Sequence, residues 1–287
     1  MTETLYRLLE SALPFSWVKY DFMKNALLAV ILITPVFALI GTMVVSKHMA
    51  FFSDVVGHSA LTGVAIGVIM GLGDPGISMV AFGILLAVIV VIFKGTTQSS
   101  SDTVLGVFFA MVVALGIVIL SRGGGFAKYT TYLIGDILAV TPVQISVLFM
   151  IAIIVVLYWV RFGNSLAIVG VNSSLAASRG INVFLIEVSF AVLVALVVTL
   201  SIRLVGILII NSLLILPAAA SRNISHNARN YTMRAIMISL LSGIAGLIFS
   251  YYWGSSSGAT IALFAALAYC MTAGAKLCLK REWVRKR

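Results

Sequence analysis

The sequence predicts an all-α integral membrane protein, a polytopic bundle of eight or nine transmembrane helices. Of its 287 residues, 61% are hydrophobic and only 10% are charged, whereas a water-soluble domain carries about 25% charged residues. Several apolar runs approach the ~20 residues that a helix needs to cross the hydrocarbon core. They cover residues 26–45, 104–120, 145–160, 183–200 and 236–251. These runs do not alternate as barrel strands do, and an open sheet in lipid would leave costly unpaired backbone groups.

We expect helices, in chain order, at about 25–46, 55–73, 76–93, 103–121, 141–160, 182–201, 203–221, 232–252 and 258–278. Gly73-Asp74-Pro75-Gly76 marks a tight turn after the second segment, and the run 254–258 marks another before the last. Only Arg203 stands between the segments at 182–201 and 203–221. We therefore expect one of those two helices to be broken or re-entrant.

The chain divides into three regions. Residues 1–24 lack the short basic start and the small-residue cleavage site of a secretory signal, and their leucines, with Phe15 and Trp17, predict a short helix in the membrane interface. Residues 25–278 form the transmembrane domain. Residues 279–287 form a basic tail.

The net charge of +10 reflects membrane topology. The C-terminal end from Lys276 and the loop with Arg222, Arg229 and Arg234 hold nine of the 19 lysines and arginines. By the positive-inside rule both regions face the cytoplasm. Counting back, residues 94 and 161–180 also lie inside, whereas residues 74 and 255 lie outside, as do residues 122 and 128 against the rule. No basic patch is interleaved with aromatic residues, so nucleic-acid binding is not expected.

Polar residues within the apolar segments are the candidates for function. Of the three histidines, only His58 is embedded in an apolar helical pattern, and Asp54 precedes it by four residues. On a helix the two side chains project from one face, one turn apart, and together they offer half of the donors that a divalent transition metal needs. Ionisable groups at membrane depth indicate a substrate or ion pathway. The alternative is structural: Ser53 or Asp54 caps a helix and His58 bonds a neighbour.

The sequence around this pair resembles a known family. Residues 44–65 (VVSKHMAFFSDVVGHSALTGVA) are similar to the signature Arg-Arg-Met-Ala-Phe-Phe-Gly-Asp-Ala-Leu-(Ser/Ala)-His of the membrane subunits of bacterial zinc, manganese and iron ABC importers. Residues 205–222 (VGILIINSLLILPAAASR) resemble a second motif of that family, and residues 102–106 and 132–142 give shorter matches. The family's paired arginines are Lys47 and His48 here, and its glycine is Ser53.

The resemblance implies a permease with the fold of type II ABC importers, residues 25–278 being the permease domain, in the bacterial plasma (inner) membrane with a cytoplasmic C-terminus. Two copies would pair with cytoplasmic ABC ATPase subunits, and an extracellular or periplasmic metal-binding protein would deliver the ion. The cargo would be zinc, alternatively manganese or iron, with no permanently bound cofactor. The implied metal ligands are Asp54 and His58, and the candidates for the translocation path are Asn211, Ser212, Pro217 and Asp136. Leu175, Ala176 and Gly180 would form the ATPase coupling segment, within a loop at 161–182 that could equally be an ordinary connector ending in a glycine cap.

Absent motifs weigh against other function classes. The sequence contains no P-loop, so ATP hydrolysis would fall to the partner ATPase, and no His-Glu-x-x-His, which disfavours an intramembrane zinc protease. A stand-alone, proton-coupled carrier would scatter several acidic residues over its spans, and only five lie between residues 25 and 275. Cys270 and Cys278 form no Cys-x-x-Cys pair and are expected to serve packing.

Overall fold

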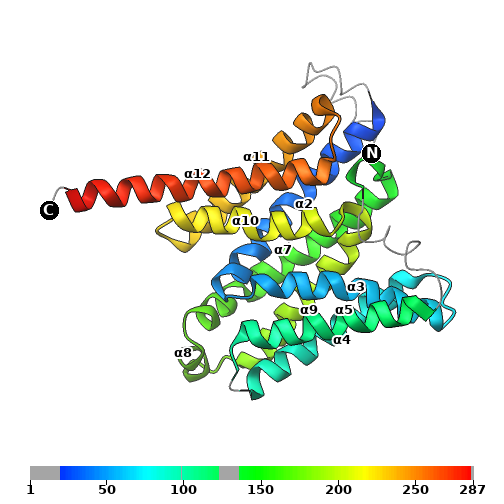
Figure 1. Ribbon diagram of the computed structural model, residues 1–287. Helices are drawn as coiled ribbons and strands as arrows, with labels where there is room; N and C mark the ends of the chain where they lie inside the picture. The colour runs from blue at the N-terminus through cyan, green and yellow to red at the C-terminus, as the bar shows by residue number, and fades with distance from the viewer. Residues whose placement is uncertain (1–19, 98, 123–135, 286–287) are drawn as a thin grey trace. The chain divides into compact units, whose positions relative to one another are not determined.

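The computed structural model describes residues 20–97, 99–122 and 136–285, and the regular structure in these ranges is helical (Figure 1). In order the elements are α2 (Asp21–Ser46), α3 (Ala50–Ile69), α4 (Pro75–Thr96), α5 (Ser101–Arg122), the 3-10 turn η2 (Ile137–Ala139), α7 (Pro142–Val171), α8 (Ser173–Ser178), α9 (Val183–Val205), α10 (Ile207–Ile224), α11 (Ala228–Trp253) and α12 (Ser257–Arg285). The interfacial helix expected within residues 1–24 falls mainly outside the described residues.

Eight of the described helices are long and apolar enough to cross a membrane. The ninth, α10, has a shorter apolar stretch, Ile209–Ile224. It follows α9 with only Gly206 between them, and Gly206 adopts a φ of 87°, which favours glycine. The expected count of eight or nine helices is confirmed. The expected break within one of the two helices at 182–221 is not seen, because α9 continues past Arg203 to Val205 and α10 begins at Ile207.

Local sequence explains where several helices begin. Asp74 caps α4 by accepting a hydrogen bond from the Gly76 backbone N–H (2.9 Å), with Pro75 in the first helical turn. At the start of α7, the Gln144 side chain accepts from the Thr141 N–H (2.8 Å) and the Thr141 hydroxyl accepts from the Gln144 N–H (3.4 Å). This reciprocal pair is a capping box.

Two helices run further than hydropathy predicts. The prediction that residues 161–182 form a loop is wrong over its first half, because α7 continues to Val171. No proline interrupts residues 161–171, and a helix need not end where its side chains become polar. The connector is thus limited to residues 172–182. Likewise α12 continues through most of the basic tail, to Arg285.

The chain divides into two compact units. Unit 1 comprises residues 1–42, 136–153 and 208–287, and unit 2 comprises residues 43–135 and 154–207. In unit 1, α11 packs against α12, and the Ser239 hydroxyl of α11 donates to the Thr34 carbonyl of α2 (3.0 Å). In unit 2, α3 is the central helix and packs against α4, α5 and α9.

Small residues allow α3 to approach its neighbours closely. A Cβ on Gly63 would lie 2.6 Å from the Cα of Met79, so α3 and α4 meet backbone to backbone. On the side of α5, the Thr62 hydroxyl donates to the Val112 carbonyl at 2.7 Å. Unit 2 is therefore built around a buried, polar-bearing α3.

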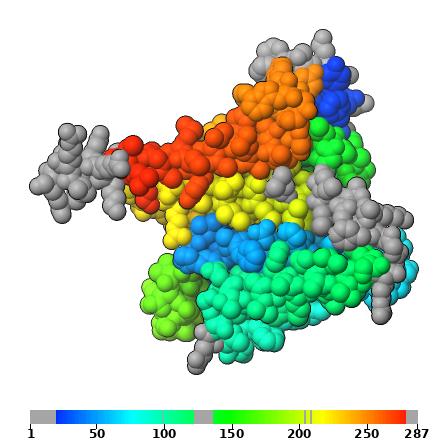
Figure 2. Space-filling model, viewed as in Figure 1, coloured from blue at the N-terminus to red at the C-terminus, as the bar shows by residue number. Residues whose placement is uncertain are grey.

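The peripheral helices expose apolar side chains, as lipid contact requires. Only 11% of the apolar window of α12 and 17% of that of α7 is buried, and α12 lies on the surface in Figure 2, coloured orange to red. The prediction that Cys270 and Cys278 serve packing is wrong within this chain, because both are exposed on α12.

Candidate metal site and coupling segment

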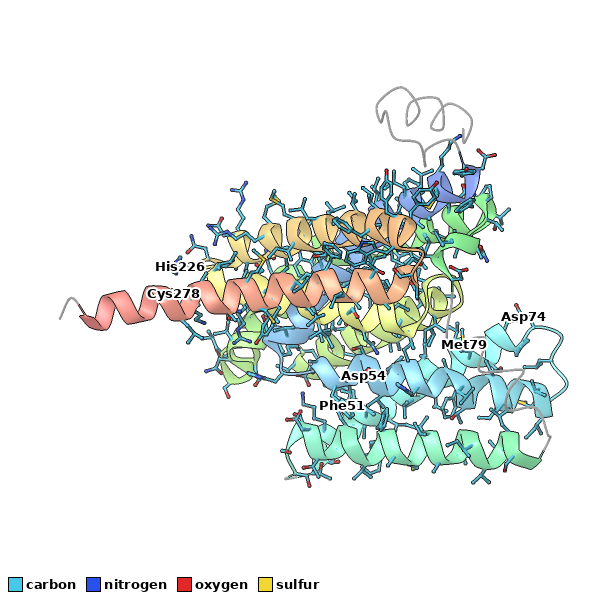
Figure 3. The ribbon with its side chains drawn as sticks, turned by 45° about the horizontal axis from the view of Figure 1, so that its top comes forward. Phe51, Asp54, Asp74, Met79, His226 and Cys278 are labelled. Atoms are coloured by element: carbon cyan, nitrogen blue, oxygen red, sulfur yellow. The ribbon has the colours of Figure 1, made fainter. Side chains whose placement is uncertain are left out.

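Asp54 and His58 lie on α3, the central helix of unit 2. Between Phe52 and Ala65 every residue of α3 is buried except these two, which are half-buried. Figure 3 labels Asp54 and Phe51 toward the start of α3 and Asp74 beyond its other end. The two residues of this stretch that could bind a cation therefore share a partly open strip, and the rest of residues 52–65 is buried.

The backbone does not support a capping role for Ser53 or Asp54. The N-cap of α3 is Met49, which makes no side-chain capping bond. The Ser53 hydroxyl is buried and donates to the Ala50 carbonyl at 3.1 Å. Asp54 lies within the helix, so the N-terminus of α3 does not account for a carboxylate at this position.

The hydrogen bond of His58 selects its tautomer. Its Nδ1 lies 3.0 Å from the backbone oxygen of Asp54, and because a carbonyl only accepts, Nδ1 must carry the proton. In the neutral ring Nε2 then holds the lone pair. Histidines that bind metals in proteins commonly donate their other N–H to a backbone carbonyl in this way, so the hydrogen bond of His58 is compatible with a ligand role for Nε2.

An aromatic ring packs against His58, and a second ring packs against the first. The rings of Phe109, on α5, and His58 meet edge to face with centroids 5.0 Å apart. Phe109 is also 5.3 Å from the ring of Phe51. The sequence gives no sign of this contact, because Phe109 is one apolar residue in an apolar run.

The turn between α2 and α3 fixes where α3 begins. The Met49 N–H donates to the Val44 carbonyl (2.9 Å) and the His48 N–H donates to that of Val45 (3.3 Å), the hydrogen-bond pattern of a Schellman motif. His48 occupies the left-handed position, with φ of 53°. Met49 is both the last residue of this motif and the N-cap of α3, so no linker residue lies between the motif and α3.

The other candidates for the path lie in unit 1. Asn211 and Ser212 are half-buried on α10, and Pro217 is buried within the same helix. Asp136 is exposed and caps η2, accepting from the Leu138 N–H at 2.9 Å. A local capping bond thus accounts for the Asp136 carboxylate, while Asn211 and Ser212 stand on a helix whose regular bonding Pro217 interrupts.

The predicted coupling segment forms a short, exposed helix. All residues from Val171 to Gly180 are exposed except Ala176, which is fully buried. Asn172 caps α8 by accepting from the Leu175 N–H (3.1 Å). Gly180 ends it at φ of 76°, its N–H and that of Ile181 bonding the carbonyls of Ala177 and Ala176. Gly180 is therefore a glycine cap, and the face of α8 open to a partner is that of Leu175.

Among the described residues no group of three or more His, Cys, Asp or Glu side chains could hold a metal ion. Asp54 and His58 therefore offer two donors, fewer than the four or more that a divalent transition metal takes from protein and water. The arrangement suits transient binding of a transported ion better than a closed structural site.

A multi-pass helical bundle with a half-buried ionisable pair on the central helix of one unit is typical of a membrane transport protein. Residues 19–275 match the ABC 3 transport family, and the chain belongs to this family. It is thus the membrane permease subunit of an ABC transporter and is not itself an enzyme. The resemblance read from residues 44–65 and 205–222 is confirmed.

Relatives of this chain carry different cargoes. It is 33% identical over 254 residues to the high-affinity zinc uptake system membrane protein ZnuB of Haemophilus influenzae, covering 88% of this chain and 97% of that protein. It is 29% identical over 256 residues to the manganese transport system membrane protein MntC of Listeria monocytogenes (88% and 90%). A chain of the solved PsaBC from Streptococcus pneumoniae, in complex with Fab, matches with a TM-score of 0.76 and 26% identity over 95% of each chain. The expected fold is confirmed.

Proposed function

We propose that this permease belongs to an ATP-driven importer that moves a divalent transition metal, zinc, into the cytoplasm. The observation that carries the proposal is the exposure pattern of α3, in which Asp54 and His58 alone interrupt a buried stretch. The hydrogen bond that leaves the His58 Nε2 lone pair available supports the same role. The relatives named for zinc and manganese uptake agree with a divalent cargo.

Ligand chemistry does not decide between zinc and manganese, and the preference for zinc comes from the likeness of the sequence, notably of residues 135–142, to the zinc branch of the family. Imidazole suits zinc and carboxylate suits manganese, and the pair supplies one of each. Intrinsic affinity does not decide it either, because almost any such site binds zinc more tightly than manganese whichever ion is physiological. The alternative is import of manganese or iron by the same mechanism. The relative named for manganese transport supports this alternative.

The exposed surface of α8 suggests an ATPase partner, and the small number of metal donors in one chain suggests a homodimer. We assign α8 as the contact for a cytoplasmic ABC ATPase subunit, because nine of the ten residues at 171–180 are exposed and a short helix fits a groove on a partner. A homodimer would double the donors to two carboxylates and two imidazoles. An extracellular or periplasmic metal-binding protein would supply the ion, and lipid would cover α7 and the rest of the apolar periphery.

Asn211 and Ser212 are proposed to line the path that the ion takes. Pro217 removes one backbone donor from α10 and leaves a carbonyl near that path. Amide, hydroxyl and carbonyl oxygens can replace part of an ion's hydration shell without holding it tightly. Asp136 would act at the entrance, after its capping bond is exchanged for the ion.

The direct test compares ligand variants with variants of the same residue types elsewhere. Asp54→Ala and His58→Ala are expected to abolish ATP-dependent metal uptake while the protein still inserts and binds its ATPase. Asp74→Ala and His226→Ala are the matched controls, since both residues are exposed and lie off α3 (Figure 3). Uptake at the wild-type rate in both ligand variants would place the site elsewhere.

The metal is tested separately from the mechanism. A host without its own zinc and manganese importers is starved of zinc, manganese or iron, and the growth defect that the transporter relieves identifies the cargo. Binding competition is a poor substitute, because intrinsic affinity favours zinc regardless of the physiological ion. Relief of manganese starvation alone would replace zinc by manganese and leave the permease role intact.

A further inference from the structure

Lys47 is a buried cation at the turn between α2 and α3. Its side chain is only 5% exposed, and its Nζ lies 3.5 Å from Oε1 of Glu187, on α9, whose side chain is 35% exposed. The Nζ atom is buried and forms the ion pair without hydrogen-bond geometry. Holding an ammonium away from water is costly, so this position calls for an explanation beyond surface charge.

The surroundings of Lys47 come from the two helices that flank α8. A Cβ on Gly170, near the end of α7, would lie 3.8 Å from Cγ of Lys47, so the lysine stem passes over that glycine. The Nζ atom is 6.0 Å from the ring centroid of Phe190 on α9, within the range of a cation–π contact. Lys47 therefore touches both the helix that enters α8 and the helix that leaves it.

The Glu187 carboxylate compensates the burial of the Lys47 ammonium only in part. Burial lowers the pKa of the Lys47 ammonium, and the Glu187 carboxylate opposes that shift. A displacement of Glu187 would therefore leave a desolvated cation with reduced compensation. Such a group resists independent movement of α9 and of the turn that carries it.

The turn passes any such movement directly to α3. Lys47 immediately precedes His48 and Met49, which complete the Schellman motif and cap α3. At 1.5 Å per helical residue, Asp54 lies only about 8 Å along the axis from Met49. The path from Glu187 to Asp54 and His58 thus crosses one ion pair and one hydrogen-bonded turn.

We propose that the Lys47–Glu187 ion pair couples movement of α8, produced by the ATPase partner, to the position of Asp54 and His58. Lys47 is then a positioning residue for transport. This inference rests on the proposed function of the protein as an ATP-driven metal importer. The competing explanation is a structural role, but replacing both members of a buried ion pair by uncharged groups of similar volume is often neutral for stability. Stability alone therefore gives little reason for the pair.

The test measures metal uptake and ATP hydrolysis on the same reconstituted complex of permease and ATPase. The variants are Lys47→Met, Glu187→Gln, the exchange Lys47→Glu with Glu187→Lys, and the conservative Lys47→Arg. Lys94→Met serves as the control, because Lys94 is close enough to Lys47 to affect its charge yet lies on α4. Thermal unfolding of each variant is recorded in parallel.

We expect the single variants to lower the ratio of metal uptake to ATP hydrolysis about tenfold, the scale of a typical coupling between sites. Hydrolysis should stay within about twofold of wild type, as should the ratio for Lys94→Met. The exchange variant (Lys47→Glu with Glu187→Lys) and Lys47→Arg should both keep most of the wild-type ratio of metal uptake to ATP hydrolysis. Equal losses of uptake and hydrolysis, or an unchanged ratio in both single variants, would overturn the inference. A wild-type complex without ATP-dependent uptake would instead contradict the proposed function itself.

Discussion

The Phe109 ring meets the His58 ring edge to face, with centroids 5.0 Å apart and an interplanar angle of 71°. The contact joins α5 to the ligand helix α3 at the imidazole itself. Aromatic pairs of this geometry contribute about 0.5–1.5 kcal/mol beyond the area they bury. Phe109 therefore restricts the rotation of the His58 ring and shields one of its sides from water.

We predict that Phe109→Ala weakens metal binding about three- to tenfold, because His58 loses a contact of roughly 1 kcal/mol that keeps its ring oriented. The measurement is metal titration of the purified permease by calorimetry. Phe108→Ala is the control, since the neighbouring Phe108 packs edge to face on Phe93 at 5.4 Å instead. It should lower stability and leave metal affinity unchanged, and an equal loss of affinity in both variants would contradict the assigned role of Phe109.

A second prediction concerns the left-handed residue at the turn. His48→Gly should raise the midpoint of thermal unfolding in detergent, because a non-glycine residue in that region costs about 1 kcal/mol or more. His48→Val should lower the midpoint, since a branched Cβ fits the left-handed region poorly. His226→Gly is the control for a histidine replaced in a segment where positive φ is not required. Equal behaviour of the two His48 variants would show that the turn does not need its observed backbone.

The third prediction concerns the close contact of α3 and α4. Gly63→Ala should destabilise the protein by about 1–3 kcal/mol, because the added Cβ would lie 2.6 Å from the Met79 Cα and the helices would have to separate. Gly106→Ala, on α5, is the matched control, since nothing lies within 4 Å of a Cβ there. Denaturant or thermal unfolding compares the two. A tolerated Gly63→Ala would mean that α4 can shift away from α3.

A fourth prediction addresses the ATPase contact. Leu175→Glu should reduce copurification of the ATPase subunit while metal binding persists, because Leu175 is 46% exposed on α8 and would lose its apolar contact with the partner. Bulky charged replacements of Ala176 or Gly180 should uncouple hydrolysis from transport by a different route. Ala176 is fully buried and Gly180 has φ of 76°, so such changes distort α8 itself.

His226→Glu is the control for this fourth set, because it adds the same charge to another exposed connector, before α11. It should leave ATPase binding unchanged. If Leu175→Glu instead lost metal binding and kept the ATPase, α8 would not be the docking helix.

The helices were predictable from sequence because long apolar runs report membrane burial directly. Hydropathy does not reveal where a helix continues beyond its apolar stretch. The helical structure of residues 161–171 and the extension of α12 were therefore not predictable in this way. The Asp54–His58 pair was predictable because its spacing is local to one helix. The partners of Phe109 and Lys47 were not, since each contact joins residues far apart in the chain and depends on how α3, α5 and α9 pack in unit 2. The amino-acid composition also does not differ in a way that would indicate the division into two units.

The exposure of Cys270 and Cys278 on α12 gives the protein two built-in chemical reporters. They are its only cysteines, so thiol labelling is site-specific without any engineered residue. They are eight positions apart on α12, about 12 Å along the helix axis, which makes them markers at two depths. On intact cells, a membrane-impermeant maleimide and a membrane-permeant one would then distinguish thiols that water reaches from outside from thiols that it reaches from the cytoplasm, and a thiol that faces lipid would react with neither. Protection of either thiol on assembly would reveal a neighbouring subunit that covers this helix.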